Sequence, residues 1–293
     1  MARHHFVPQF LLRRWATSGK SVAYFFEAAA DRVIENPKAL VASACQIADL
    51  NTFFGVRAAD RDFPETGFFT PIVDTPAARA LDVILEKGIR SLTAAQRVDW
   101  ARLLVSFAVR TPETLRDMGP KETTKAVDLV EAAASGPPDD ERKVTAIIQA
   151  NMALFKRNFP LRAAMELSTD PEKLAAVDGM TWWMRRFRRP VILIGDRPLL
   201  TPPRAPSPCG IPLNDPKCLI VLPISPTVVF FASSTPKIWD KTRTMPLSKV
   251  AAMVNEETIW RSSCVYFPNK TLGSFVMPRI GGKATGTWQP NGP

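Results

Sequence analysis

Histidine is nearly absent from this chain of 293 residues, which contains two, the neighbours His4 and His5. Histidine is the side chain whose unperturbed pKa lies closest to neutral pH, so it is the first candidate for acid–base chemistry or metal binding. Histidine-based chemistry therefore has a single place in this sequence. We expect His5, with His4 beside it, to be the catalytic candidates.

Several other signatures are missing. No two of the four cysteines form a Cys-x-x-Cys pair, which disfavours a zinc site and gives no sign of a disulfide framework. The sequence has no phosphate-binding P-loop, no Rossmann fingerprint and no His-Glu-x-x-His motif. Ser225 lacks the Gly-x-Ser-x-Gly elbow of a nucleophilic serine. The enzyme classes built on these motifs are therefore not indicated.

Long apolar runs are also missing. No run approaches the roughly 18 residues of a membrane helix, and the first residues lack the apolar core and cleavage site of a signal peptide. We therefore expect a cytoplasmic protein with no membrane partner. Hydrophobic residues make up 46% and charged residues 23% of the chain, as in an ordinary globular protein with a sizeable core.

The order of the apolar patterns predicts an α+β fold. Strands are expected at 22–27, 32–35, 180–184, 190–194, 218–222, 227–232 and 264–267, and helices at 8–15, 75–87, 93–118, 121–134, 139–159, 171–177 and 246–260. The N-terminal hairpin and the C-terminal strands should form a mixed or antiparallel sheet. The middle of the chain should supply a helical layer.

No clear linker divides the chain, so we expect a single α+β domain over residues 1–280. It would comprise an N-terminal motif and hairpin (1–60), a helical layer (72–178) and a strand-rich basic part (179–267). Residues 281–293, rich in Gly, Pro and Thr, are predicted to form a flexible tail.

Positive charge is concentrated in the C-terminal part. The net charge is +10, and residues 179–293 carry 15 basic and 5 acidic side chains, whereas the rest of the chain is balanced. This asymmetry favours a polyanionic partner. The candidate phosphate- and nucleic-acid-binding residues are Arg185, Arg186, Arg188, Arg189, Arg197 and Trp182. The alternative is a solvated basic strand edge beside core tryptophans.

Three segments resemble the bacterial family known as domain of unknown function 4238. They are His5-Phe-Val-Pro-Gln-Phe-Leu-Leu-Arg13, Leu193-Ile-Gly-Asp-Arg-Pro198 and Leu222-Pro-Ile-Ser-Pro226, and Asn255 also fits a family position. The resemblance spans nearly the whole chain. The family usually has Ser or Thr before the aspartate and Asn after it, where this chain has Gly195 and Arg197. Because the family has no settled activity, the resemblance implies candidate residues rather than chemistry.

Asp196 follows the apolar stretch 191–194, and residues at the carboxyl end of a core strand often face a pocket. His5 and Asp196 converging there would act as base and orienting group, or bind a divalent metal. The alternative is structural, with Asp196 bonding its own turn and His5 bonding a backbone carbonyl.

Two functions remain open. The first is a metal-dependent phosphodiesterase or nuclease acting on nucleic acid. The second is a non-catalytic protein that binds nucleic acid or another protein, with Phe53-Phe54 and Phe68-Phe69 as candidate protein contacts. A third interpretation treats the net charge as a solubility feature and the motifs as folding devices.

Overall fold

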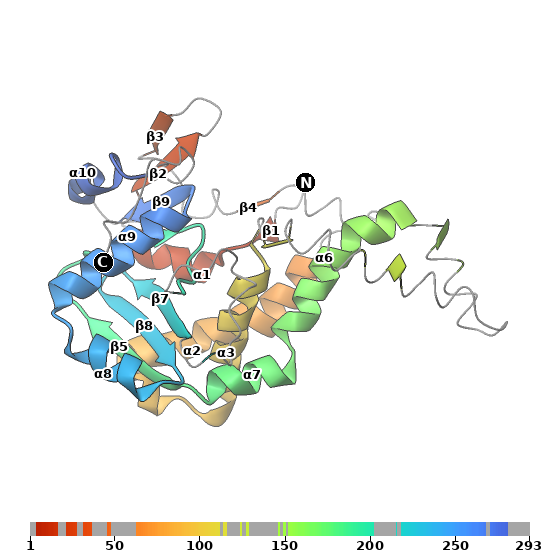
Figure 1. The fold of residues 1–293 in the computed structure, drawn as a ribbon, viewed down its shortest axis with the longest axis horizontal. Coiled ribbons are helices and arrows are strands. Elements are labelled where there is room, and N and C mark those ends of the chain that lie inside the picture. Colours follow the sequence, from red (N-terminus) through yellow and green to blue (C-terminus); the bar gives the residue numbers. More distant parts are fainter. Residues whose placement is uncertain are drawn as a thin grey trace.

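The computed structural model describes residues 4–16, 22–27, 32–36, 46–47, 63–111, 114–115, 152–201, 218–267 and 270–280, with the isolated positions 124, 127–128, 146, 149–150 and 215. Together they form an α+β fold, as the sequence predicts (Figure 1). Among these residues, no helix has the length and apolar character needed to cross a membrane. The predicted tail at 281–293 lies outside the described residues.

The first sheet joins the two ends of the chain. Its strand order is β3 (Arg32–Asn36), β2 (Val22–Glu27), β9 (Cys264–Phe267) and β6 (Ile194–Gly195). All neighbours pair antiparallel, with Tyr24 opposite Val265 and Ile194 opposite Tyr266. This confirms the predicted sheet of N-terminal hairpin and C-terminal strands.

The second sheet is an antiparallel set of three strands, with β8 (Val228–Ser233) between β5 (Thr181–Arg186) and β7 (Leu219–Ser225). Every residue of β7 and β8 is buried. Successive side chains on a strand point to opposite faces. Phe230 accordingly meets Trp182 edge to face at 5.5 Å, while Phe231 stacks on Trp183 at 5.4 Å.

The helical layer covers one face of this second sheet. It contains the π-helix η3 (Pro64–Asp74), α2 (Thr75–Lys87), the short η4 (Ile89–Ser91), α3 (Ala94–Val109), α6 (Met152–Ser168) and α7 (Pro171–Asp178). Trp100 of α3 meets Phe230 edge to face at 5.6 Å. Such aromatic pairs contribute roughly 0.5–1.5 kcal/mol beyond the area they bury. Trp100 therefore fixes α3 against β8 (Figure 1).

The N-terminal segment lies beside this layer. β1 (His4–His5) pairs antiparallel with β4 (Gln46–Ile47), and α1 (Gln9–Leu12) continues into the 3-10 turn η1 (Arg13–Trp15). The indole N–H of buried Trp15 donates to the carbonyl of Ile192 at 2.8 Å. This bond connects the N-terminal segment that carries His5 to the residues just before β6.

The C-terminal helices complete the fold. They are α8 (Pro236–Thr244), α9 (Leu247–Arg261), the 3-10 turn η6 (Lys270–Leu272) and α10 (Gly273–Val276). α8 packs against β5 and β8 (Figure 1), and α9 packs against β6. A second apolar cluster, with Leu193, Ile259 and Phe267, lies beneath the four-stranded sheet.

Several local predictions were wrong: α8 was not predicted, and the helix expected at 93–118 ends as α3 at Val109. The helix expected to end at Phe159 continues as α6 through Pro160 to Ser168, since the buried Leu161 and Met165 hold its far end in the core. The strand expected at 190–194 is reduced to β6. Residues 64–74 were not predicted as a helix. The predicted helix at 121–134 lies outside the described residues apart from isolated positions.

Phe68 and Phe69 lie in η3 with 9% and 4% of their surface exposed. They belong to the core, so they do not form the exposed contact segment that was expected. The second expected contact, Phe53-Phe54, lies outside the described residues.

Candidate functional site

His5 lies against a carboxylate that sequence analysis did not identify. Its ring Nδ1 is 2.8 Å from Glu65 Oε1, and its backbone N–H donates to Glu65 Oε2 at 3.1 Å. The two side chains are 14% and 19% exposed. Glu65 therefore holds both the ring and the backbone of His5, across a separation of 60 residues.

The second ring nitrogen of His5 is also engaged. His5 Nε2 lies 2.7 Å from the amide nitrogen of Gln9, and Arg13 donates to Gln9 Oε1 at 2.8 Å. With Nδ1–H donating to the carboxylate, Nε2 of the neutral ring accepts from the Gln9 amide. This contact network orients the ring and leads outward to the exposed Arg13.

The π-helix η3 sets the position of Glu65. The N–H of Thr75 donates to the carbonyl of Thr70, five residues earlier, which is the bonding of a π-helix. With about 4.4 residues per turn, two positions nine residues apart lie on the same face, whereas an α-helix would place them on opposite faces. Glu65 and Asp74 therefore face the same neighbour, Arg110.

Arg110 is a buried cation between these two carboxylates. It ends α3 and is 2% exposed, and its NH1 group donates to Asp74 Oδ1 at 2.9 Å. Its guanidinium lies over the rings of Phe107 and Phe69, at 4.7 and 5.4 Å. Within the described part of the chain, its Nε and NH2 groups have no hydrogen-bond partner.

The electrostatics of the two carboxylates differ. Burial alone would raise the pKa of Glu65, but the hydrogen bonds from His5 and the positive charges of His5 and Arg110 outweigh it and lower that pKa. Burial raises the pKa of Asp74, and the nearby charge of Glu65 raises it further against the opposing effect of Arg110. The environment of Glu65 thus favours its ionised form, whereas the ionised form of Asp74 depends mainly on its ion pair with Arg110.

This geometry suits acid–base chemistry. A carboxylate that holds Nδ1–H orients the imidazole and leaves Nε2 to exchange a proton with a reacting group. Among the described residues, no group of three or more His, Cys, Asp or Glu side chains is arranged to hold a metal ion.

Asp196 has a different setting from the one expected. Its carboxylate accepts from the backbone N–H of Ser263, at 3.1 and 3.3 Å, and its own N–H donates to the carbonyl of Cys264 at 3.0 Å. These contacts fix the turn after β6 to the start of β9, in a part of the molecule apart from β1 (Figure 1). The structure thus pairs His5 with Glu65, and Asp196 with the backbone of the sheet.

Two arginines of the expected phosphate-binding cluster bind helix ends. Arg185 donates to the carbonyls of Thr242, Arg243 and Met245, at 2.6, 2.6 and 2.8 Å, at the C-terminal end of α8. Arg186 donates to carbonyls in the last turn of α2, at 2.8 and 3.2 Å. The last carbonyls of a helix have no intrahelical partner, so these arginines act as C-terminal caps.

The other members of the expected phosphate-binding cluster also differ in their exposure. Trp182 is buried, donates its indole N–H to the Val177 carbonyl at 2.9 Å and carries Arg97 over its ring at 3.9 Å. Arg197 is half-buried in the turn after β6, whereas Arg188 and Arg189 are exposed. Arg188 and Arg189 are therefore the two members that are exposed and have no partner among the described residues.

Other exposed cations lie on the C-terminal helices, on α8 and at the start of α9. Arg243 stacks its guanidinium over Trp239 at 4.6 Å. In the part of the chain that the structure describes, no ion pair joins this set to a carboxylate: Lys237, Lys241, Arg243 and Lys249. Sequence analysis did not single out these residues.

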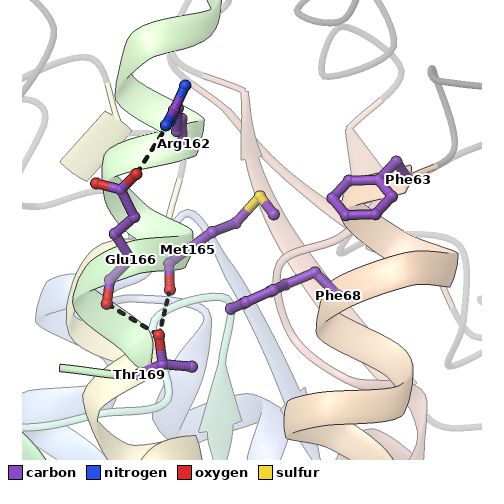
Figure 2. Close-up of a pocket in the computed structure, with 6 residues that line it drawn as sticks. All are labelled: Phe63, Phe68, Arg162, Met165, Glu166 and Thr169. Atoms are coloured by element: carbon purple, nitrogen blue, oxygen red, sulfur yellow. Dashed lines mark hydrogen bonds and ion pairs between the residues drawn. The ribbon is translucent and has the colours of Figure 1, made fainter. Parts of the chain in front are cut away.

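A pocket of about 340 Å³ opens between η3 and α6. Figure 2 shows Phe68 and Met165 pointing toward each other across it, with Phe63 at one side. Arg162 and Glu166 form an ion pair of 3.0 Å along α6. Phe63 and Phe68 are one π-helical turn apart, on a different face of η3 from Glu65, so this pocket does not open onto the His5 ring.

The residues around His5 carry little signal in the sequence. Gln9 follows His5 by four positions and Arg13 follows Gln9 by four, a spacing that places side chains together on a helix. Glu65, Asp74 and Arg110 have no such local pattern. They meet only because the π-helix and the end of α3 pack beside β1.

The comparisons give a family and no activity. The chain belongs to the family described as protein of unknown function (DUF4238), whose model matches residues 3–271. No curated protein and no solved structure matches the chain. The matched range includes every residue of the His5 network.

Proposed function

We propose that this member of the DUF4238 family is a hydrolase of phosphate esters that acts on the phosphodiester bonds of nucleic acid, with His5 as its general base. The observation that supports this most directly is the 2.8 Å contact between His5 Nδ1 and Glu65. A base oriented by a carboxylate is a recurring arrangement in hydrolytic sites.

Each residue then has a defined part. Nε2 of His5 takes a proton from water after the Gln9 amide gives up that contact. The water oxygen bonds to phosphorus, the bond from phosphorus to the leaving oxygen breaks, and the protonated ring returns its proton to the leaving oxygen. Arg13, exposed and bonded to Gln9, would hold the phosphate oxygens, because a guanidinium matches phosphate geometry.

The test is hydrolysis by the purified chain. Substrates are bis(p-nitrophenyl) phosphate and end-labelled single- and double-stranded DNA and RNA. Each assay is run with EDTA and with manganese, which decides whether a divalent metal belongs to the reaction. His5→Gln should lower kcat by about 10²- to 10⁴-fold, the usual contribution of a general base, with a smaller fall for Glu65→Gln.

The matched control is Arg162→Gln, which removes an exposed arginine whose ion pair lies outside the His5 network. It should retain the wild-type rate. Full activity in a well-folded His5→Gln variant would refute the proposal, as would the absence of hydrolysis of every substrate under both metal conditions.

We propose as a second candidate that the chain binds nucleic acid without cleaving it. The specific support is a set of exposed cations that form no ion pair with a carboxylate among the described residues: Arg188, Arg189, Lys237, Lys241, Arg243 and Lys249. Phosphate contacts release counterions, so binding to labelled single-stranded DNA should weaken steeply as salt is raised.

Charge reversal tests this surface. Lys237→Glu/Lys241→Glu should weaken binding and flatten its dependence on salt, whereas Arg79→Glu/Arg90→Glu, the same change in charge at exposed positions of the helical layer, should do less. Equal loss in the two double variants would assign the affinity to net charge alone. That result would exclude α8 as the binding surface.

A further inference from the structure

The buried Arg110 competes with His5 for the same carboxylate. Both oxygens of Glu65 are used by His5, one by its ring and one by its backbone N–H. Arg110 is close enough to Glu65 for the two charges to interact. Among the described carboxylates, however, Arg110 donates a hydrogen bond to Asp74 and not to Glu65. Glu65 thus remains bonded to the imidazole although a cation lies beside it.

This division is unexpected for a buried guanidinium. Its Nε and NH2 groups have no hydrogen-bond partner in the described part of the chain, and a buried donor without a partner destabilises the folded state. Arg110 would therefore gain from a second carboxylate. Its bond to Asp74 and the rings of Phe69 and Phe107 hold it where it is.

We propose that Asp74 is a positioning residue, which keeps Arg110 bonded to itself and so reserves both oxygens of Glu65 for His5. The π-helical spacing of η3 permits this arrangement, because it places Asp74 two turns from Glu65 on the same face. The effect of Asp74 on catalytic rate rests on the proposed function. Its effect on the His5 ring does not.

The proposal predicts that substitutions of Asp74 and Arg110 have non-additive effects on the position of the His5 ring. In Asp74→Asn the guanidinium loses its charged partner, turns to Glu65 and displaces the ring. In Asp74→Asn/Arg110→Gln the competitor is gone as well, so the ring returns to Glu65. Arg110→Gln alone leaves the ring in place, because nothing then competes for Glu65.

The measurement is the pair of ring ¹⁵N chemical shifts of His5 in labelled protein at neutral pH. With two histidines in the chain, comparison with His5→Gln assigns the signals. Wild type should show the shifts of a ring whose Nδ1–H is bonded to a carboxylate, and Glu65→Leu provides the shifts of a released ring. We expect Asp74→Asn to move toward Glu65→Leu, and the double variant and Arg110→Gln to match wild type.

Two results overturn the proposal. One is a folded Asp74→Asn variant with wild-type ring shifts, which would leave Asp74 with a purely structural role. The other is displacement of the ring by Arg110→Gln, a test that remains decisive if Asp74→Asn does not fold. The ring is observed without turnover, so a failure of the proposed hydrolysis leaves this outcome readable and is seen separately in the activity assay.

Discussion

Asn255 is joined to Leu193 by a buried hydrogen bond, in which the backbone N–H of Leu193 donates to Asn255 Oδ1 at 3.0 Å. The same side chain donates from Nδ2 to the carbonyl of Val191 at 2.8 Å. Asn255 thus gives the segment before β6 the pairing that a neighbouring strand would give. This explains how residues predicted to form a strand are held in place without forming one.

Replacing Asn255 should therefore destabilise the fold. Asn255→Leu leaves a buried N–H and a carbonyl without their partner, and we expect the free energy of unfolding to fall by about 2–5 kcal/mol. Asn255→Asp keeps an acceptor but no donor and should be intermediate. Urea unfolding measures both, with the exposed neighbour Glu256→Gln as control. An Asn255→Leu variant as stable as the control would contradict the bridging role.

Gly195 allows the chain to pass closely over Ser262. A Cβ atom at position 195 would lie 1.8 Å from Ser262 Oγ and 2.7 Å from its Cβ. Gly195→Ala should therefore lower the free energy of unfolding by about 1–3 kcal/mol, the usual cost of overfilling a core. Thermal unfolding of the single and double variants tests this, because Ser262→Gly should recover part of the loss. Purely additive effects would show that the two positions do not meet.

Arginine side chains that are alike in the sequence should behave differently in solution. Arg185→Met removes three hydrogen bonds to carbonyls at the C-terminal end of α8, so we expect about 2–4 kcal/mol less stability. Arg188→Met, at an exposed position, should stay within about 0.5 kcal/mol of wild type. Denaturant unfolding at low and high salt gives both values. An Arg185→Met variant as stable as wild type would show that Arg185 does not stabilise the end of α8, and would make it a candidate for phosphate binding again.

The fold was predictable where the local pattern determines it. α2 covers the predicted residues 75–87, with Pro76 in its first turn and Gly88 directly after its end, although Thr75 does not cap it because η3 leads directly into it. β9 also forms at its predicted positions. The π-helix was not predictable in this way, because Gly67 and Pro71 lie inside it and both disfavour an α-helix. A π-helix has more residues per turn than an α-helix, so its buried aromatic side chains do not recur with the 3.6-residue period that identifies a helix in a sequence.

The candidate site was predictable only in part. The scarcity of histidine singled out His5, but its carboxylate partner is 60 residues away, and no local period connects the two. Sequence also could not separate an exposed arginine from one that caps a helix, because both lie in the same basic run. Burial and hydrogen bonding decide between these roles, and both depend on tertiary structure.

Glu65 should make stability depend on acid pH. Its pKa in the folded protein is lowered from the ordinary 4.5, so the unfolded chain takes up a proton more readily than the folded one. The contribution of Glu65 is therefore complete above about pH 4.5 and is lost as the pH falls through the folded pKa. Asp74 has the opposite sign, because its raised pKa favours the folded state at low pH.

The difference between wild type and Glu65→Gln isolates the first effect, since both proteins keep Asp74. We expect wild type to be the more stable near neutral pH, because an amide cannot accept both hydrogen bonds from His5. The two unfolding free energies should converge as the pH is lowered from about 6 to about 3. Urea titrations at four or five pH values measure this. A difference that stays constant over that range would show that the Glu65 carboxylate does not gain its stability from His5 and Arg110.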